Sequence, residues 1–125
     1  YVLAATLNAE ARGEGVRGMT AVGAVIRRRA SLDRKYWGGS EIIDVCLYPR
    51  QFECWNNKES IEIREQDSFE LALMVARNII SGNYTDETGG ADHYNNPEEE
   101  APPGWLNNVT KTVKIGEHQF YKSNN

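Results

Sequence analysis

Glu10 and Glu14 are the residues of this chain best suited to acid–base chemistry. They stand four positions apart in the pentapeptide EARGE, with Gly13 between them. A carboxyl group at the end of an apolar helix loses hydration and faces the negative end of the helix dipole, and both effects raise its pKa. Glu10 follows an apolar segment and is therefore the first candidate for a general acid. Two solvated helix carboxylates, with Arg12 as a local partner, explain the same pattern, because E-x-x-x-E is common.

Two other chemistries use residue types that the chain contains. His93 and His118, with Cys54 or Asp92, could bind zinc, but the H-E-x-x-H spacing is absent. Cys54 could also pair with either histidine as a nucleophile. Isolated histidines usually pack and form hydrogen bonds inside a fold, so we expect no metal and no cofactor.

The spacing of apolar residues indicates the helices that must position these side chains. It predicts helices over residues 1–11, 16–31, 41–47 and 67–80. Ser40 is expected to cap the third of these, and the fourth starts at a cap formed by Asp67 or Ser68. The predicted buried stripe of the second helix comprises Met19, Val22, Val25, Ile26 and Ala30. The predicted buried stripe of the fourth comprises Phe69, Ala72, Leu73, Ala76 and Ile80.

The C-terminal third of the chain predicts a small sheet. His93 and Tyr94 start or line a strand. Alternation over residues 109–115, followed by a turn at Gly116, predicts either a terminal strand pair or one strand broken at Gly116. Residues 56–66 are polar and are expected to form a surface loop. Helices precede the sheet, so the predicted fold is a mostly helical α+β single domain with a small antiparallel sheet.

Composition restricts the class of protein further. A chain of 125 residues and 14.1 kDa fits one domain. A net charge of −4 argues against sequence-independent binding of nucleic acid, which depends on Lys and Arg. No apolar run reaches the roughly 18 residues that a membrane span needs. A basic group either faces an anionic polymer or forms a solvated helix face, and it comprises Arg27, Arg28, Arg29, Arg34 and Lys35.

Two further features leave alternatives open. Cys46 and Cys54 could form one disulfide in an oxidising compartment, or Cys54 could be a buried free thiol among aromatic residues. Several aromatic residues fall in predicted loops, where they act either as core plugs or as surfaces on which sugars stack. These residues are Trp37, Trp55, Tyr84, Tyr94 and Trp105.

A series of motifs in the right order resembles the SleB/CwlJ-type cell-wall hydrolases, the spore-cortex-lytic enzymes and their phage and bacterial relatives. Residues 8–15 (NAEARGEG) and 18–26 (GMTAVGAVI) are similar to the opening motif of that family. Residues 51–55 (QFECW) are similar to its Q-F-S-C-W element, and residues 88–97 (TGGADHYNNP) to its T-G-G-A…Y-x-N-P element. Residues 103–121 are similar to its closing element, so the motifs cover nearly the whole chain.

The resemblance implies cleavage of peptidoglycan glycan strands, in most members by lytic transglycosylation. Glu10, the first glutamate of EARGE, then corresponds to the catalytic acid, and Glu14 is the second carboxylate at the site. In an unbroken helix Glu14 would lie beside Glu10, too close to straddle a sugar, so we expect Glu14 to orient groups or support the fold. Candidates for sugar binding or proton relay are Gln51, Trp55, Thr88, Tyr94 and His118, although Trp55 could equally belong to the core.

The resemblance therefore predicts that residues 1–125 form a cell-wall hydrolase catalytic domain with a lysozyme- or transglycosylase-like cleft between the Glu10 turn and the sheet. We expect a monomer that acts on peptidoglycan glycan strands in the periplasm or outside the cell, with no nucleic acid and no membrane span. The insertion after Trp55 favours a small lysin from a phage or a bacterium. Three alternatives stay open: a hydrolytic muramidase, a zinc- or cysteine-dependent wall amidase or peptidase, and a non-catalytic wall-binding phage protein.

Overall fold

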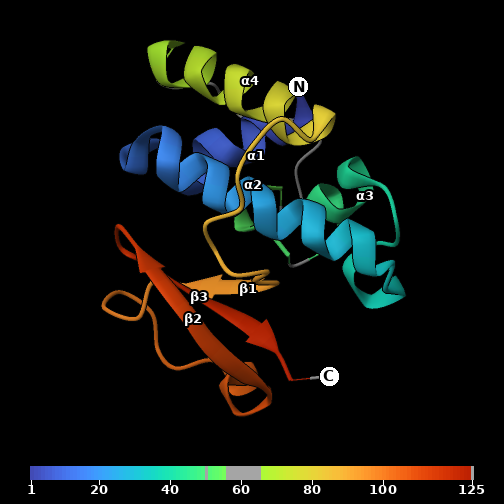
Figure 1. The fold of residues 1–125 in the computed structure, drawn as a ribbon, viewed down its shortest axis with the longest axis vertical. Helices are drawn as coiled ribbons and strands as arrows, with labels where there is room; N and C mark the ends of the chain where they lie inside the picture. The colour runs from blue at the N-terminus through green and yellow to red at the C-terminus, as the bar shows by residue number, and fades with distance from the viewer. Residues whose placement is uncertain (50, 56–65, 125) are drawn as a thin grey trace.

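The computed structural model describes residues 1–49, 51–55 and 66–124. In these ranges the helices gather in one half of the molecule and the sheet forms the other half (Figure 1). The elements in chain order are α1 (Val2–Ala11), η1 (Arg12–Glu14), α2 (Gly15–Leu32), η2 (Lys35–Trp37), α3 (Ile42–Leu47), η3 (Glu53–Trp55), α4 (Gln66–Ser81), β1 (His93–Asn95), η4 (Gly104–Asn108), β2 (Val109–Ile115) and β3 (His118–Ser123). The predicted loop over residues 56–66 lies outside the described residues except for Gln66, which begins α4.

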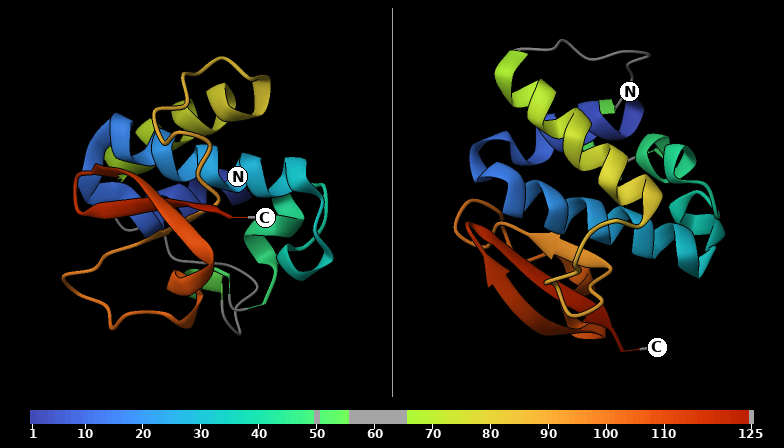
Figure 2. Two further views of the ribbon diagram at one scale, coloured as in Figure 1. Left: turned by 60° about the horizontal axis from the view of Figure 1, so that its bottom comes forward. Right: turned by 45° about the horizontal axis from the view of Figure 1, so that its top comes forward.

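Helix α2 is the central element of the fold. It packs against α1, α3 and α4 and also contacts β1 and β2, as the views in Figure 2 show. Its predicted apolar stripe is buried from Met19 to Ala30. The close approach of α4 depends on Gly23, because a Cβ at this position would lie 2.7 Å from Cγ1 of Ile79. Burial of these two faces against each other stabilises the helical half.

The sheet has the order β1-β3-β2, and both pairings are antiparallel. His93 pairs with Tyr121, Val109 pairs with Ser123, and the register shifts between Lys111 and Lys114. The turn between β2 and β3 contains Gly116 with a φ of +60°, a conformation that favours glycine. The predicted strand pair and the mostly helical α+β fold are both confirmed.

Three local predictions about helices are wrong. Glu41, not Ser40, is the N-cap of α3, because the helix starts one residue later than predicted. Glu41 makes no side-chain cap hydrogen bond. Asp67 lies in the first turn of α4 rather than at its cap, since α4 already begins at Gln66. Ile80 is 62% exposed, and Ile79 is fully buried in its place. The buried face of α4 is centred on Ala72, Val75 and Ile79, which puts Ile80 beyond its edge.

The remaining structural expectations concern the cysteines and the membrane. Cys46 and Cys54 are not joined by a disulfide in the described part of the chain, so that alternative is not realised in this structure. Burial raises the pKa of the Cys46 thiol to about 11. In the part of the chain that the structure describes, every helix is too short or too polar to cross a bilayer.

Replacing Ile79 with alanine should destabilise the domain much more than the same change at Ile80. Ile79→Ala leaves a cavity between α2 and α4 beside Gly23, and such changes cost about 2–5 kcal/mol. Ile80→Ala removes an exposed side chain and should change the free energy of unfolding by less than about 0.5 kcal/mol. Urea unfolding of both variants measures the difference, and equal losses would contradict the assigned face of α4.

Candidate active site

A polar cleft lies between the end of α1, helix α2 and the edge strand β1. Its larger part has a volume of about 660 Å³, and a second hollow of about 410 Å³ adjoins it. Both are lined by Ala9, Glu10, Asn96, Glu99 and His118, so they form one continuous cleft. The larger part is also lined by Arg29, Trp37, Gln51, Phe52, His93, Tyr94, Glu100 and Trp105.

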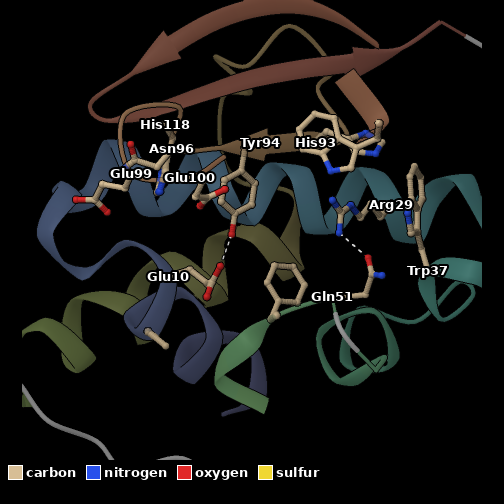
Figure 3. Close-up of a pocket in the computed structure, with 13 residues that line it drawn as sticks. Glu10, Arg29, Trp37, Gln51, His93, Tyr94, Asn96, Glu99, Glu100 and His118 are labelled. Carbon is tan, nitrogen blue, oxygen red and sulfur yellow. Dashed lines mark hydrogen bonds between the residues drawn. The ribbon is translucent and has the colours of Figure 1, made fainter. Parts of the chain in front are cut away.

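Glu10 lies half-buried in the wall of this cleft. It is the next-to-last residue of α1, which ends where Gly13 and Gly15 interrupt the helical sequence. The Tyr94 hydroxyl, from β1, donates a hydrogen bond of 2.5 Å to Glu10 Oε1 (Figure 3). Burial and the Glu10 carboxylate both raise the pKa of Tyr94 well above its usual value, so the phenol stays protonated and continues to donate.

Glu14 does not share a helix face with Glu10, because the chain turns through η1 after α1. Its Oε1 accepts the backbone N–H of Glu117 at 2.9 Å, in the turn between β2 and β3. A Cβ at Gly18 or at Gly116 would collide with the Glu14 side chain, so both glycines make room for it. Glu14 therefore lines only the smaller hollow and ties η1 to the hairpin.

His118 begins β3 and lines both parts of the cleft. His118 is 9% exposed, and its ring packs edge-on against the Tyr94 ring, with 5.0 Å between centroids. Its Nδ1 is 4.0 Å from Glu14 Oε1 and has no hydrogen-bond partner among the described residues. Burial lowers the pKa of His118, although the nearby carboxylates of Glu14, Glu99, Glu100 and Glu117 oppose this shift. The net shift lowers the pKa of His118 and favours its neutral form.

Gln51 and Arg29 occupy the other end of the cleft. Arg29 Nη1 donates to Gln51 Oε1 at 2.9 Å, and Arg29 Nε donates to the backbone carbonyl of Asp92 at 2.7 Å. The guanidinium also stacks over the Trp37 ring at 5.1 Å. Arg29 is only 7% exposed, so the solvated helix face suggested for the basic group does not extend to this residue.

Two predicted sugar contacts, Trp55 and Thr88, do not line the cleft. Trp55 is buried in the core, where its Nε1 donates to Thr6 Oγ1 at 2.7 Å. Thr88 is fully buried, and its hydroxyl donates to Asp86 at 2.6 Å and accepts from the Ala91 N–H at 3.1 Å. The motif around Thr88 therefore shapes the loop that leads into β1, because its polar groups are satisfied within that loop.

Sequence reasoning did not select Glu99, Glu100 and Asn96, which line the cleft on the loop after β1. An acidic run directly after Asn96 and Pro97 was the available signal, but charge runs are usually solvated.

His93, a zinc candidate, instead lies between the rings of Trp37 and Trp105 (centroids at 5.4 and 4.7 Å). Within the described ranges no three His, Cys, Asp or Glu side chains come together as a metal site.

Comparison with known proteins agrees with this fold, which is that of a small, mostly helical α+β domain. The model of the cell wall hydrolase family matches residues 13–121. The chain belongs to this cell wall hydrolase family. Glu10 lies just before the matched residues, so its assignment depends on the geometry described above.

Two solved structures are similar over almost the whole chain. The catalytic domain of the germination-specific lytic transglycosylase SleB from Bacillus anthracis is 27% identical with a TM-score of 0.75, over 97% of this chain and 91% of that one. The catalytic domain of the Bacillus cereus SleB protein is 29% identical with a TM-score of 0.75, over 97% of this chain and 87% of that one. Comparison with the curated proteins finds no match.

Truncating Glu14 should loosen the contact between η1 and the β2–β3 turn. Glu14→Ala leaves the Glu117 N–H without its charged acceptor, and we expect a loss of about 1–3 kcal/mol in the free energy of unfolding. Glu14→Gln keeps an acceptor oxygen and should lose less than half as much. Chemical denaturation of the two variants tests this, and a stability of Glu14→Ala equal to that of the wild type would rule out the proposed tie.

Proposed function

We propose that residues 1–125 form a catalytic domain that cleaves the glycan strands of peptidoglycan between N-acetylmuramic acid and N-acetylglucosamine, as a lytic transglycosylase. The family and the similarity to a SleB lytic transglycosylase catalytic domain support the substrate and the reaction. The domain acts as a monomer on the bacterial cell wall. Its origin from a phage or a bacterium stays a prediction.

The observation that carries this proposal is the Glu10 carboxylate, hydrogen-bonded to Tyr94 inside a cleft of about 660 Å³. Glu10 in its acid form protonates the glycosidic oxygen that leaves with glucosamine, and the bond from this oxygen to C1 of muramic acid breaks. The resulting carboxylate then takes the proton of the muramic 6-hydroxyl while O6 bonds to C1. Glu10 recovers its proton, the 1,6-anhydro ring closes, and no water is consumed.

Tyr94 supports the carboxylate state of Glu10 in this scheme. Its phenol keeps its proton because burial and the adjacent carboxylate raise its pKa. A retained donor stabilises the carboxylate that forms when Glu10 has given up its proton. Gln51, Asn96 and His118 lie along the same cleft as contacts for sugar hydroxyls and amides.

A hydrolytic muramidase is the second candidate, because Glu99 and Glu100 line the same cleft as Glu10. Most hydrolysing glycosidases use two carboxylates that flank the scissile bond, one as the acid and one as the base or nucleophile. Glu14 is a weaker choice for the second group, since it binds the Glu117 N–H away from Glu10. A metal-dependent amidase lacks a ligand cluster in the described part of the chain.

Mass spectrometry of digested sacculi tests the proposal. The wild type should release muropeptides with 1,6-anhydromuramic ends, which are lighter by one water than the reducing ends of a muramidase. Glu10→Gln should lower the cleavage rate by about 100-fold or more with an unchanged melting temperature, because the proton donor is lost. Glu14→Gln is the matched control and should retain most of the activity.

Three results would contradict the proposal, each in a different way. Reducing ends would favour the muramidase, and free stem peptides would favour an amidase. Full cleavage by Glu10→Gln would remove Glu10 from the reaction.

A further inference from the structure

Arg29 is a buried positive charge in the wall of the cleft. It projects from α2, is 7% exposed, and lines the larger part of the cleft. A guanidinium has five N–H donors. Within the described part of the chain, Arg29 donates two hydrogen bonds to neutral acceptors, the Asp92 backbone carbonyl and the Gln51 side-chain amide. The rings of Trp37 and Phe52 lie 5.1 and 5.9 Å from its centre and hold it in place.

This charge lacks the partner that buried arginines normally have. Arg, Lys, Asp and Glu are almost never fully buried unless they are paired. Among the residues that the structure describes, no carboxylate lies within ion-pair distance of Arg29. The carboxylate of Asp92, its closest acidic neighbour in sequence, accepts from His93 at 2.8 Å and from the Ser123 N–H at 2.9 Å instead.

Burial lowers the pKa of Arg29, and the nearby Asp92 and Glu10 carboxylates offset this only in part. The guanidinium nevertheless stays charged, because arginine does not lose its proton in proteins. A charge in this position keeps an uncompensated desolvation cost, and an anion entering the cleft would relieve that cost.

The charges of the cleft are arranged along its length. Figure 3 shows Arg29, Gln51 and Trp37 at one end, Glu10 and Tyr94 in the middle, and Glu99, Glu100 and His118 at the other end. The acidic end repels an anion, and the Arg29 end attracts it. A negatively charged ligand that spans Glu10 therefore has one favourable orientation.

We propose that the Arg29 end of the cleft is a subsite for a carboxylate carried by the wall glycan strand. This inference rests on the proposed function, because it specifies the substrate of the same site. The planar fork of Arg29 would bind the carboxylate in a bidentate manner. Two sources in peptidoglycan carry this group: the lactyl carboxylate of a muramic acid without its stem peptide, and the carboxylates of the stem peptide.

Binding measurements with defined strands separate these possibilities. Two pairs of substrates are titrated calorimetrically into Glu10→Gln, which prevents turnover. The first pair is peptide-free strands with free lactyl carboxylates and the same strands with those groups converted to methylamides. The second pair is peptide-bearing strands and the same strands with their stem carboxylates methylamidated. In this background, Arg29→Gln removes the charge and Arg29→Lys keeps the charge without the fork. Arg34→Gln is the matched control, because Arg34 stacks on the same Trp37 ring at 4.9 Å without lining the cleft.

A charged hydrogen bond of this kind is worth roughly tenfold or more in affinity. Strands with a free carboxylate should bind at least about tenfold more tightly than their methylamidated counterparts. Arg29→Gln should abolish that ratio, Arg29→Lys should keep part of it, and Arg34→Gln should leave it unchanged. A ratio for the peptide-free pair alone identifies the lactyl carboxylate, and a ratio for the peptide-bearing pair identifies the stem.

Equal affinities within both pairs would overturn the proposal, and this comparison needs no change at Arg29, so it holds even if Arg29→Gln fails to fold. A ratio that persists unchanged in folded Arg29→Gln would also overturn it. These outcomes are independent of cleavage, whereas loss of the anhydro products in the wild type would overturn the proposed function instead.

Discussion

One hydrogen bond between a phenol and a carboxylate joins the two halves of this domain at the centre of its cleft. Glu10 belongs to α1 in the helical half, and Tyr94 belongs to β1 at the edge of the sheet. The bond therefore exists only when the sheet is docked on α2 in the observed way. The position of the Glu10 carboxylate is consequently a property of the whole fold rather than of its local sequence.

Two neighbouring groups of contacts support the position of the sheet against the end of α1. Gly18 and Gly116 leave space for Glu14 to bind the β2–β3 turn, so the hairpin is fixed to the segment directly after Glu10. His118 is buried beside Tyr94, and its Nδ1 lies 4.0 Å from Glu14 Oε1. The two carboxylates of EARGE thus have separate surroundings: Glu10 faces the main cleft, and Glu14 supports its wall.

Local pattern was enough to predict much of the fold. Apolar spacing located the helices, and alternation located the strand pair around Gly116, because both depend on neighbours in the chain. The predicted buried stripe of α4 was wrong at Ile80. Which edge of α4 is buried depends on how α4 packs on α2, and Gly23 of α2 lets Ile79 approach closely. The burial of Arg29 was equally hidden, because three consecutive arginines carry no signal of which one faces inward.

The residues of the candidate site could also be predicted only in part. Motif resemblance selected Glu10, Gln51, Tyr94 and His118, and the structure brings all four into one cleft. It also selected Thr88 and Trp55, whose polar groups are satisfied inside the fold. A motif preserves residues that shape a loop or fill a core as well as those that touch a ligand, and only burial and hydrogen bonding distinguish them.

The most direct test of the account is the turnover of Tyr94→Phe on purified glycan strands, measured together with its melting temperature. This change removes one hydroxyl and retains the ring that packs on His118 and Phe120. If the phenol holds the reacting carboxylate, kcat should fall by about tenfold or more, while the melting temperature shifts by only a few degrees. Wild-type kcat in a folded Tyr94→Phe variant would contradict the central role given to this bond.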